Sequence, residues 1–236
     1  PIVVKQEEII LGSRESIEDT ARVISRYADG ITIRTFAHSD VEKFAQYADI
    51  PVINALTDSS HPCQIMADLL TIKEKFGNLE NLKVAYVGDG NNITNSLLIG
   101  CSMLGMDISV GCPEDYEPDK NYIAKAEELA LISGSKIEII QDPYQAVKYA
   151  NVVYGDTWTS MGQESEAEKR RSIFRDYQIN SELLEQADAD CIVLHCLPAH
   201  KGEEITEEVF ELHAQSIFDQ AENRLHAQKA IMASII

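Results

Sequence analysis

The sequence lacks the features that mark several large classes of protein. Its five cysteines are odd in number and scattered without a CxxC pair, so neither a disulfide framework nor a zinc site is expected. No apolar run approaches the roughly 20 residues of a membrane span, and no basic segment followed by an apolar one opens the chain. These absences favour a globular protein of the reducing cytoplasm, with no membrane partner.

Positive charge is also scarce. The chain has 20 basic residues against 39 acidic ones, which gives a formal net charge of -19. Such a field repels polyphosphates and anionic lipids at long range, so a nucleic-acid partner is not expected. An anionic substrate would have to be bound by a few local arginines and backbone amides.

A complete dinucleotide-binding fingerprint is missing as well. Gly88 and Gly90 follow an apolar run, but Ile93 stands where GxGxxG requires its third glycine. A nicotinamide cofactor is therefore not expected, and no other cofactor is suggested. Asn91 and Asn92 stand at an expected helix start, where they either cap the helix or point an amide at a carboxylate ligand.

The chain does contain a regular alternation of strand-like apolar runs with helical periodicity. This pattern indicates an α/β protein with two doubly wound parallel sheets. Helices are expected at 13–28, 40–47, 62–76, 122–132, 144–149 and 222–235, with one more from about residue 93. Strands are expected at 31–34, 51–55, 82–87, 108–111, 137–140, 152–154 and 191–195. The last five strands predict a Rossmann-like sheet.

We divide the chain into three parts. Residues 1–66 form the later part of a first domain, residues 67–218 form the Rossmann-like domain, and residues 219–236 form a terminal helix that packs back on the first domain. The first unit has only two convincing strands, which bury too little surface for stability alone. Since residue 1 is proline rather than methionine, we expect that an N-terminal segment of this unit is absent.

Polar side chains follow both strands of the first unit. Arg34 ends the strand at 31–34, and an HPCQ motif at 61–64 opens the next long helix. Ligands of open α/β sheets bind at the carboxyl ends of strands, and a helix N-terminus attracts anions. Arg34 and His61 are therefore candidates to bind a phosphate or polarise a carbonyl. The alternative is that Arg34 is a solvated strand end and His61 a helix cap.

A polar segment with the only tryptophan follows the strand at 152–154. It begins with DTWTSMGQE at 156–164 and runs to Arg175. Loops of this length are often lids or binding loops, with disorder as the alternative. Asp156 can accept a hydrogen bond from an ammonium group, and Met161 can pack along an aliphatic substrate stem.

The last strand leads into HCLPAH at 195–200. The cysteine and histidine suggest a nucleophilic thiol, but adjacent residues of an extended segment point to opposite sides. We therefore interpret Cys196 as a thiol that hydrogen-bonds a substrate group. Arg224, in the final helix, is either an anion ligand or a surface charge.

Taken together, the motifs resemble the aspartate/ornithine carbamoyltransferase family. In order, they are IRTF, HPCQ with ADLLT behind it, GDGNN, DTWTSMGQE, HCLPAH and FDQAENR. The resemblance covers residues 11–236. The SMG and HCLP segments resemble the ornithine branch, because aspartate-using members lack both and putrescine-using relatives replace SMG with a tyrosine-containing sequence.

The resemblance implies that the side-chain amine of L-ornithine attacks carbamoyl phosphate, giving L-citrulline and phosphate without a cofactor or metal. It implies a place in arginine biosynthesis and leaves open whether the reaction runs toward citrulline or in reverse. The catalytic residues would be Arg34, His61, Asp156 and Cys196. The residues binding carbamoyl phosphate would be Arg34, His61, Gln64, Cys196, Leu197 and Arg224. The residues binding ornithine would be Asn92, Asp156, Ser160 and Met161.

The chain departs from the family pattern in its first domain. The family's Ser-Thr-Arg-Thr phosphate-binding motif appears nowhere in it, so we expect little or no carbamoyl transfer by this chain alone. The family forms trimers with shared sites, which implies a homotrimer or a multiple of it, and Arg14 stands where the shared loop often has lysine. The alternatives are a non-catalytic ornithine-binding or regulatory paralogue and a carbamoyltransferase for another amine.

Overall fold

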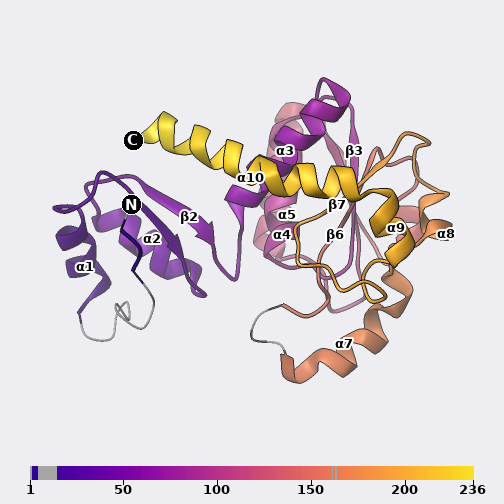
Figure 1. Ribbon diagram of the computed structural model, residues 1–236, viewed down its shortest axis with the longest axis horizontal. Helices are drawn as coiled ribbons and strands as arrows, with labels where there is room; N and C mark the ends of the chain where they lie inside the picture. Colours follow the sequence, from indigo (N-terminus) through magenta and orange to yellow (C-terminus); the bar gives the residue numbers. More distant parts are fainter. Residues whose placement is uncertain (1, 5–14, 161, 163) are drawn as a thin grey trace.

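Two parallel β-sheets organise the chain, and Figure 1 shows them as two separate bodies joined by helices. The computed structural model describes residues 2–4, 15–160, 162 and 164–236. Both sheets are wholly parallel, and helices connect their strands. The expected fold class, two parallel-sheet α/β units with a sparse first one, is confirmed.

The first unit has a two-stranded sheet. Strand β1 (Ile31–Arg34) pairs with β2 (Val52–Leu56), and α1 (Ile17–Ile24) and α2 (His38–Tyr47) pack on one face. The buried apolar core of this unit is small: it consists of Ile17, Ala21, Ile33, Val41 and Phe44. The opposite face of the sheet turns toward the C-terminal helix.

The second unit has a five-stranded sheet in the order β5-β4-β3-β6-β7. The strands are β3 (Lys83–Val87), β4 (Asp107–Gly111), β5 (Ile137–Ile140), β6 (Val152–Gly155) and β7 (Ile192–His195). The chain runs outward from β3 to β5 and then crosses to the other side with β6 and β7. Ligands of such sheets bind where this reversal occurs, at the carboxyl ends of β3 and β6.

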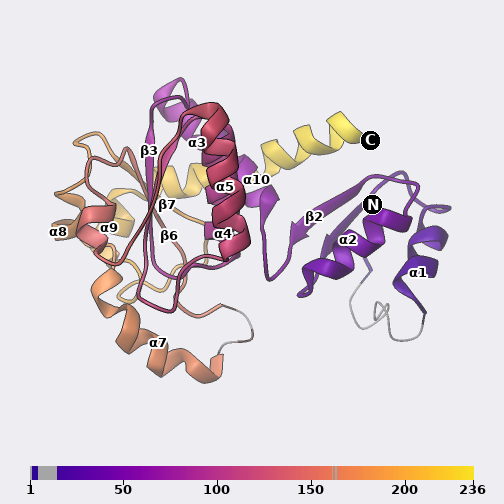
Figure 2. The ribbon, with the colours of Figure 1, turned by 180° about the vertical axis from the view of Figure 1, so that it is seen from behind.

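Helices cover both faces of the larger sheet (Figure 2). The helices after the first unit are α3 (Pro62–Phe76), α4 (Asn92–Met103), α5 (Lys120–Ser133), α6 (Pro143–Ala146), α7 (Ala167–Phe174), α8 (Ser181–Leu184), α9 (Glu207–Leu212) and α10 (Ala214–Ile235), with 3-10 turns η1 (Glu164–Glu166) and η2 (Arg175–Tyr177). No described helix is both long and apolar enough to cross a membrane.

The central strands alternate between two apolar cores. In β3, Val84 and Tyr86 pack in the core under α3, α4 and α5, whereas Ala85 and Val87 pack in the core on the other face. Strands covered by helices on both faces require apolar side chains in both directions. The expected strand positions are confirmed to within one or two residues because this pattern is so strong.

Helices α3 and α10 connect the two units. Helix α10 packs against α3 and β7, and its last turns extend toward β1 and β2 (Figures 1 and 2). Asn223 of α10 donates through Nδ2 to Thr71 Oγ1 (3.0 Å) and to Glu74 Oε2 (2.8 Å) of α3. The terminal helix therefore contacts both units. Our three-part division of the chain stays a prediction.

Two expectations about local structure were wrong. The final helix begins at Ala214 rather than at residue 222. Its first turns are stabilised by packing, because they place Ile217 and Gln220 in the protein interior. The polar stretch up to Arg175 is not one long loop, since it contains α7. Phe174 and Arg170 of α7 are buried, and these two anchors hold an otherwise polar helix in place.

Candidate active site

The first turn of α3 begins with His61 and Pro62. Proline suits the first helical position because the helix has no use for its missing N–H, and His61 precedes it without capping the helix through its side chain. The backbone N–H of His61 donates to Ser96 Oγ (2.8 Å), which fixes it against α4. The ring is 5% exposed, and its Nδ1 atom is buried without a hydrogen-bond partner.

Charge and burial together keep His61 neutral. Burial, followed by the nearby guanidinium groups of Arg224 and Arg34, lowers its pKa to about 4. Near neutral pH one ring nitrogen is therefore a donor and the other an acceptor. A neutral imidazole can donate to a developing oxyanion without bringing a charge of its own.

Gln64 is the second buried polar residue of this turn. Its side chain is 1% exposed and donates through Nε2 to Asp68 Oδ1 (2.8 Å), while its carbonyl Oε1 is buried without a partner. Most buried polar atoms in proteins are hydrogen-bonded. Two unpartnered atoms within one helical turn therefore indicate that a polar ligand completes them.

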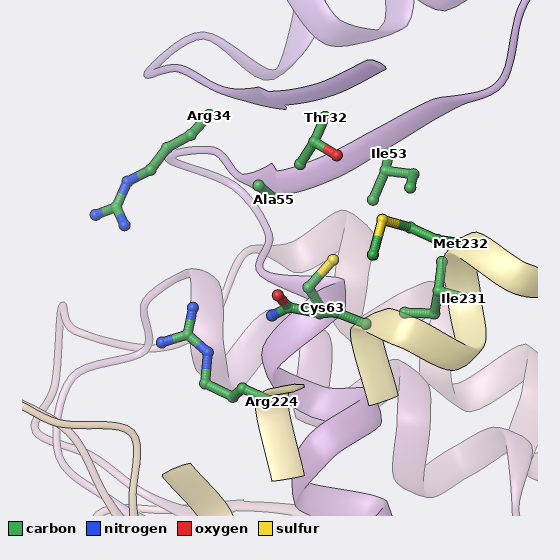
Figure 3. Close-up of a pocket in the computed structure, with 9 residues that line it drawn as sticks. Thr32, Arg34, Ile53, Ala55, Cys63, Arg224, Ile231 and Met232 are labelled. Carbon is green, nitrogen blue, oxygen red and sulfur yellow. The ribbon is translucent and has the colours of Figure 1, made fainter. Parts of the chain in front are cut away.

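Two arginines supply the positive charge of this region. Arg34 and Arg224 line a cavity of about 120 Å³ between the first sheet and α10, together with Cys63. Figure 3 shows both guanidinium groups at the same end of this cavity. In a chain with a net charge of -19, such a pair is the local positive site that an anionic ligand requires. The predicted partnership of Arg34, His61 and Arg224 is compatible with this geometry.

The N-terminus of α4 links this region to the end of β6. Asn91 caps the helix by accepting from the N–H groups of Ile93 and Thr94, and its Nδ2 donates to Asp156 Oδ2 (2.7 Å). Asn92 instead donates to the carbonyl of Thr57 (2.7 Å) in the loop before α3. Asn91 is therefore the helix cap, and the predicted contact of Asn92 with a carboxylate ligand stays a prediction.

Asp156 is the centre of the second polar cluster. It is 8% exposed and accepts through Oδ1 from the Thr157 N–H (2.7 Å) and the Cys196 thiol (2.9 Å). Burial, followed by the Asp156 carboxylate, raises the pKa of Cys196 well above its usual value. The thiol therefore stays protonated and acts as a donor, which argues against a nucleophilic thiolate.

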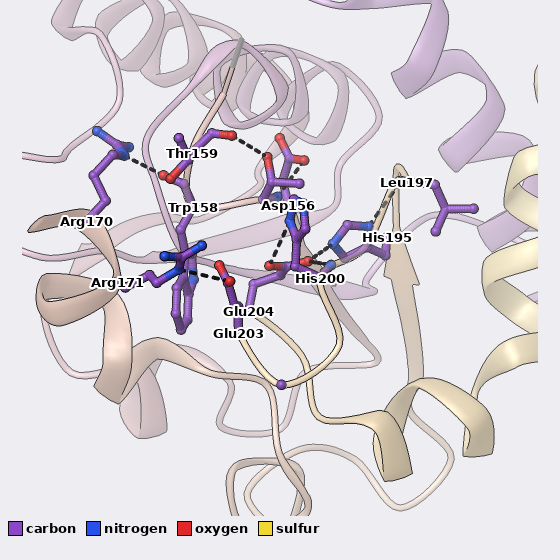
Figure 4. A network of polar contacts seen from close by, with 12 residues as sticks. Asp156, Trp158, Thr159, Arg170, Arg171, His195, Leu197, His200, Glu203 and Glu204 are labelled. Carbon is purple, nitrogen blue, oxygen red and sulfur yellow. Dashed lines mark hydrogen bonds and ion pairs between the residues drawn. The ribbon is translucent and has the colours of Figure 1, made fainter. Parts of the chain in front are cut away.

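His195 points away from Cys196, as expected for neighbours in a strand. Its Nδ1 accepts from the Leu197 N–H (3.0 Å), and its Nε2 lies 3.3 Å from Glu204 Oε1 (Figure 4). Leu197 itself has a φ of 58°, a left-handed conformation that is uncommon for leucine. This turn directs the backbone after β7 toward the sheet edge where Asp156 lies.

The segment after Asp156 is held from below by α7. Arg170 is buried and donates to the Trp158 carbonyl (Figure 4). It also donates to the Asp89 carboxylate after β3. Burial raises the pKa of Asp89 to about 6, although Arg170 opposes this shift. Ser160 is half-buried at the end of this segment, and Met161 lies outside the described residues.

One group of described side chains could hold a metal ion. His200, Glu203 and Glu204 place ligand atoms within 4.8 Å of one another. Glu203 is already paired with Arg171 (2.9 Å), and Glu204 accepts from the His200 N–H. The carboxylates of Glu203 and Glu204 are therefore already used in an ion pair and a backbone hydrogen bond, which are common roles of acidic side chains.

Sequence reasoning missed three residues that organise the site: Asp68, Gln220 and Arg170. Asp68 lies four residues after Gln64, a spacing that places both on one face of a helix and was a usable signal. Gln220 and Arg170 gave no local signal, because their partners lie far away in the sequence.

Comparison with known proteins gives consistent matches. Residues 1–74 match the family described as aspartate/ornithine carbamoyltransferase, carbamoyl-P binding domain, and residues 80–235 match its Asp/Orn binding domain. An ornithine carbamoyltransferase of Gloeobacter violaceus is 56% identical over 226 residues, covering 96% of this chain and 72% of the relative. One of Thermococcus kodakarensis is 53% identical over 235 residues, covering 100% of this chain and 75% of the relative.

Solved structures agree with these sequence matches. The ornithine carbamoyltransferase of Pyrococcus furiosus superimposes with a TM-score of 0.92 at 52% identity, over 96% of this chain and 72% of that one. An anabolic ornithine carbamoyltransferase of Campylobacter jejuni gives a TM-score of 0.92 at 41% identity, over 97% of this chain and 76% of that one.

Proposed function

The chain belongs to the aspartate/ornithine carbamoyltransferase family, and on this premise we propose that it acts as an ornithine carbamoyltransferase. The reaction transfers the carbamoyl group of carbamoyl phosphate to the side-chain amine of L-ornithine, giving L-citrulline and phosphate. The observation that carries this proposal is the pair of unpartnered buried atoms, His61 Nδ1 and Gln64 Oε1, beside two arginines. A carbamoyl phosphate has a dianionic phosphate for the arginines and an amide-like end for the buried polar atoms.

The donor end of the site uses the first turn of α3. Arg34 binds the phosphate, while His61, Gln64 and Arg224 hold the carbamoyl group. When the amine attacks, the carbonyl oxygen gains negative charge, which Arg224 and a neutral His61 stabilise. The bond between the carbonyl carbon and the phosphate oxygen then breaks, and phosphate leaves with the proton that the attacking nitrogen loses.

The acceptor end uses the carboxyl edges of β6 and β7. Asn92, Asp156, Ser160 and Met161 bind the amino-acid end of ornithine, and Cys196 with Leu197 orients its reactive amine. An alkyl ammonium has a pKa of about 10.4 and must lose a proton before it attacks. Removal of water around the amine favours the neutral form, because burial disfavours the charged ammonium.

The same family membership leads us to a biological setting. We place the protein in arginine biosynthesis in the cytoplasm, as a homotrimer or a multiple of trimers. One of the relatives, from Pyrococcus furiosus, is an anabolic ornithine carbamoyltransferase and is 51% identical over 235 residues. We also propose that the unit ending at residue 66 binds carbamoyl phosphate and that the unit at residues 67–218 binds ornithine.

The function is tested with two bisubstrate analogues, in which a phosphonoacetyl group is joined to the side-chain amine of ornithine or to the amine of aspartate. We expect the ornithine analogue to bind at least about 10-fold more tightly in calorimetry, because only this analogue keeps a free α-ammonium group for the Asp156 carboxylate to accept from. Citrulline formation is measured on the same sample, with aspartate and putrescine as control acceptors; because the chain lacks the Ser-Thr-Arg-Thr motif, we expect any rate to be low. Tighter binding of the aspartate analogue, or binding of neither, would overturn the proposal.

A further inference from the structure

Asp68 is a fully buried carboxylate one turn beyond Gln64 on α3. It has no exposed surface, and three donors converge on its two oxygens. Gln64 Nε2 (2.8 Å) and Gln220 Nε2 (2.7 Å) both donate to Oδ1, and the Tyr154 hydroxyl (3.0 Å) donates to Oδ2. The carboxylate therefore joins α3, β6 and α10 at one point.

The chemistry of this carboxylate decides which way the Gln64 amide faces. Above its pKa of about 7 the Asp68 carboxylate only accepts hydrogen bonds, so the end of Gln64 that contacts it must be the NH₂ group. The carbonyl Oε1 then occupies the other end of the amide, and this is the atom that is buried without a partner. With the amide reversed, two acceptors would face each other and the site would present a donor instead.

Gln220 does not offer an alternative way to set this orientation. Its own Oε1 accepts from the His195 N–H (2.8 Å), so its NH₂ must also face Asp68 and the Tyr154 hydroxyl (3.0 Å). Gln220 is thus a donor toward the centre of the network and leaves no acceptor there for Gln64. Asp68 is the acceptor that both glutamines share.

Burial of the Asp68 carboxylate costs desolvation free energy, and close packing alone would not require a charged group at this position. Burial raises the pKa of Asp68 to about 7, although the hydrogen bonds from Gln64, Gln220 and Tyr154 and the charge of Arg224 oppose the shift. An apolar residue of similar size would avoid this desolvation. A buried carboxylate at this position makes sense if the way it orients the neighbouring amide groups serves the function of the site.

We propose that Asp68 is a positioning residue that makes the donor site selective for a carbamoyl group over other acyl phosphates. By holding the Gln64 NH₂, it presents Gln64 Oε1 as an acceptor to the NH₂ of the bound carbamoyl group. An acetyl group has a methyl in that place and leaves the acceptor buried and unpaired. This inference rests on the proposed function, because it takes carbamoyl phosphate as the donor.

Two stable analogues isolate this contact. Phosphonoacetamide carries the NH₂ group, whereas phosphonoacetone has a methyl group in its place and is otherwise matched. We expect the wild-type chain to bind the amide at least about 10-fold more tightly in calorimetry, since an unpaired buried acceptor weakens binding of the ketone. Inability to bind either analogue would overturn the proposed function, and this inference with it.

Substitutions at Asp68 then separate positioning from simple stability. Asp68→Leu removes the acceptor, so the preference for the amide should fall to within about twofold, while the ketone affinity changes little. Asp68→Asn can keep its side-chain oxygen toward both glutamines and should retain the preference. Thr71→Val removes another buried hydrogen bond between α3 and α10 and serves as the matched control, with both affinities unchanged.

Several outcomes overturn the positioning role alone. They are equal binding of both analogues by the wild type, retention of the amide preference by Asp68→Leu, and an equal loss of both affinities in that variant. If Asp68→Leu does not fold, a structure of the wild type with phosphonoacetamide decides the matter. The ligand nitrogen within about 3.2 Å of Gln64 Oε1 supports the inference, and a ligand nitrogen that contacts only other groups overturns it.

Discussion

The first turn of α3 and the cluster around Asp156 both bury polar side chains, but they satisfy them differently. In the first turn, His61 Nδ1 and Gln64 Oε1 have no partner. Around Asp156, both carboxylate oxygens accept hydrogen bonds, from Asn91, Thr157 and Cys196. The first region is arranged for a ligand that completes it, whereas the carboxylate at the centre of the second already has protein partners on both oxygens.

Replacing Asp156 should have the largest effect on stability, because it removes the acceptor from the satisfied cluster. We expect Asp156→Leu to lower the free energy of unfolding by about 3 kcal/mol or more, since the Asn91 amide, the Thr157 N–H and the Cys196 thiol all lose their partner. Urea denaturation measures the change. Asp142→Leu, which removes an exposed cap of α6, should cost only about 1 kcal/mol. Equal losses in the two variants would contradict the contrast between the regions.

Replacing Gln64 should show the opposite balance of stability and binding. We expect Gln64→Met to change the free energy of unfolding by less than about 1 kcal/mol, because the lost bond to Asp68 is offset by removal of an unpaired buried carbonyl. Binding of phosphonoacetamide should weaken about 10-fold or more. Denaturation and calorimetry on the same preparation test this pair of effects. A large loss of stability with unchanged binding would show that Gln64, like Asp156, mainly stabilises the fold rather than binding the ligand.

Titration of His61 should give the smallest effect and sharpen the electrostatic side of the comparison. We expect an NMR titration to give a pKa of about 4 for His61, with a His61→Asn spectrum to assign the signal. Because the folded pKa lies below the usual 6.5, the unfolded state binds more protons between these values.

The sign of the stability change follows from this difference. The unfolding free energy of the wild type should be unaffected by His61 above about pH 6.5 and should decrease as the pH falls toward 4, relative to His61→Asn. A folded pKa at or above 6.5 would show that burial, together with Arg224 and Arg34, does not act on the ring as the structure indicates.

Much of the fold was predictable because its signals are local. The alternation in β3 and β6 matches strands covered on both faces, and the long helix at 62–76 is bounded by Pro62 at its first position and by Gly77 with a φ of 81° after its end. The start of α10 and the existence of α7 were missed. Both depend on buried anchors, such as Ile217 and Phe174, whose burial is not visible in a polar stretch of sequence.

The candidate site divides in the same way. Its residue types and their places at strand ends and helix starts, such as Arg34, His61 and Asp156, were readable from motifs. Which of them are neutral, paired or unpartnered was not. The low pKa of His61 results from burial beside arginines on β1 and α10, which are separate elements of the chain.

Periodicity and short motifs are properties of neighbouring residues. They were therefore enough to predict the parallel α/β architecture, the order of the strand-end motifs and the family these motifs resemble. Which polar atoms meet depends instead on how the helices and strands pack. Asp68 bonds to Tyr154, which is 86 residues away, and to Gln220, which is 152 residues away. Hydrogen bonds act over about 3 Å, so such contacts exist only after helices and strands have packed. No local pattern specifies them in advance.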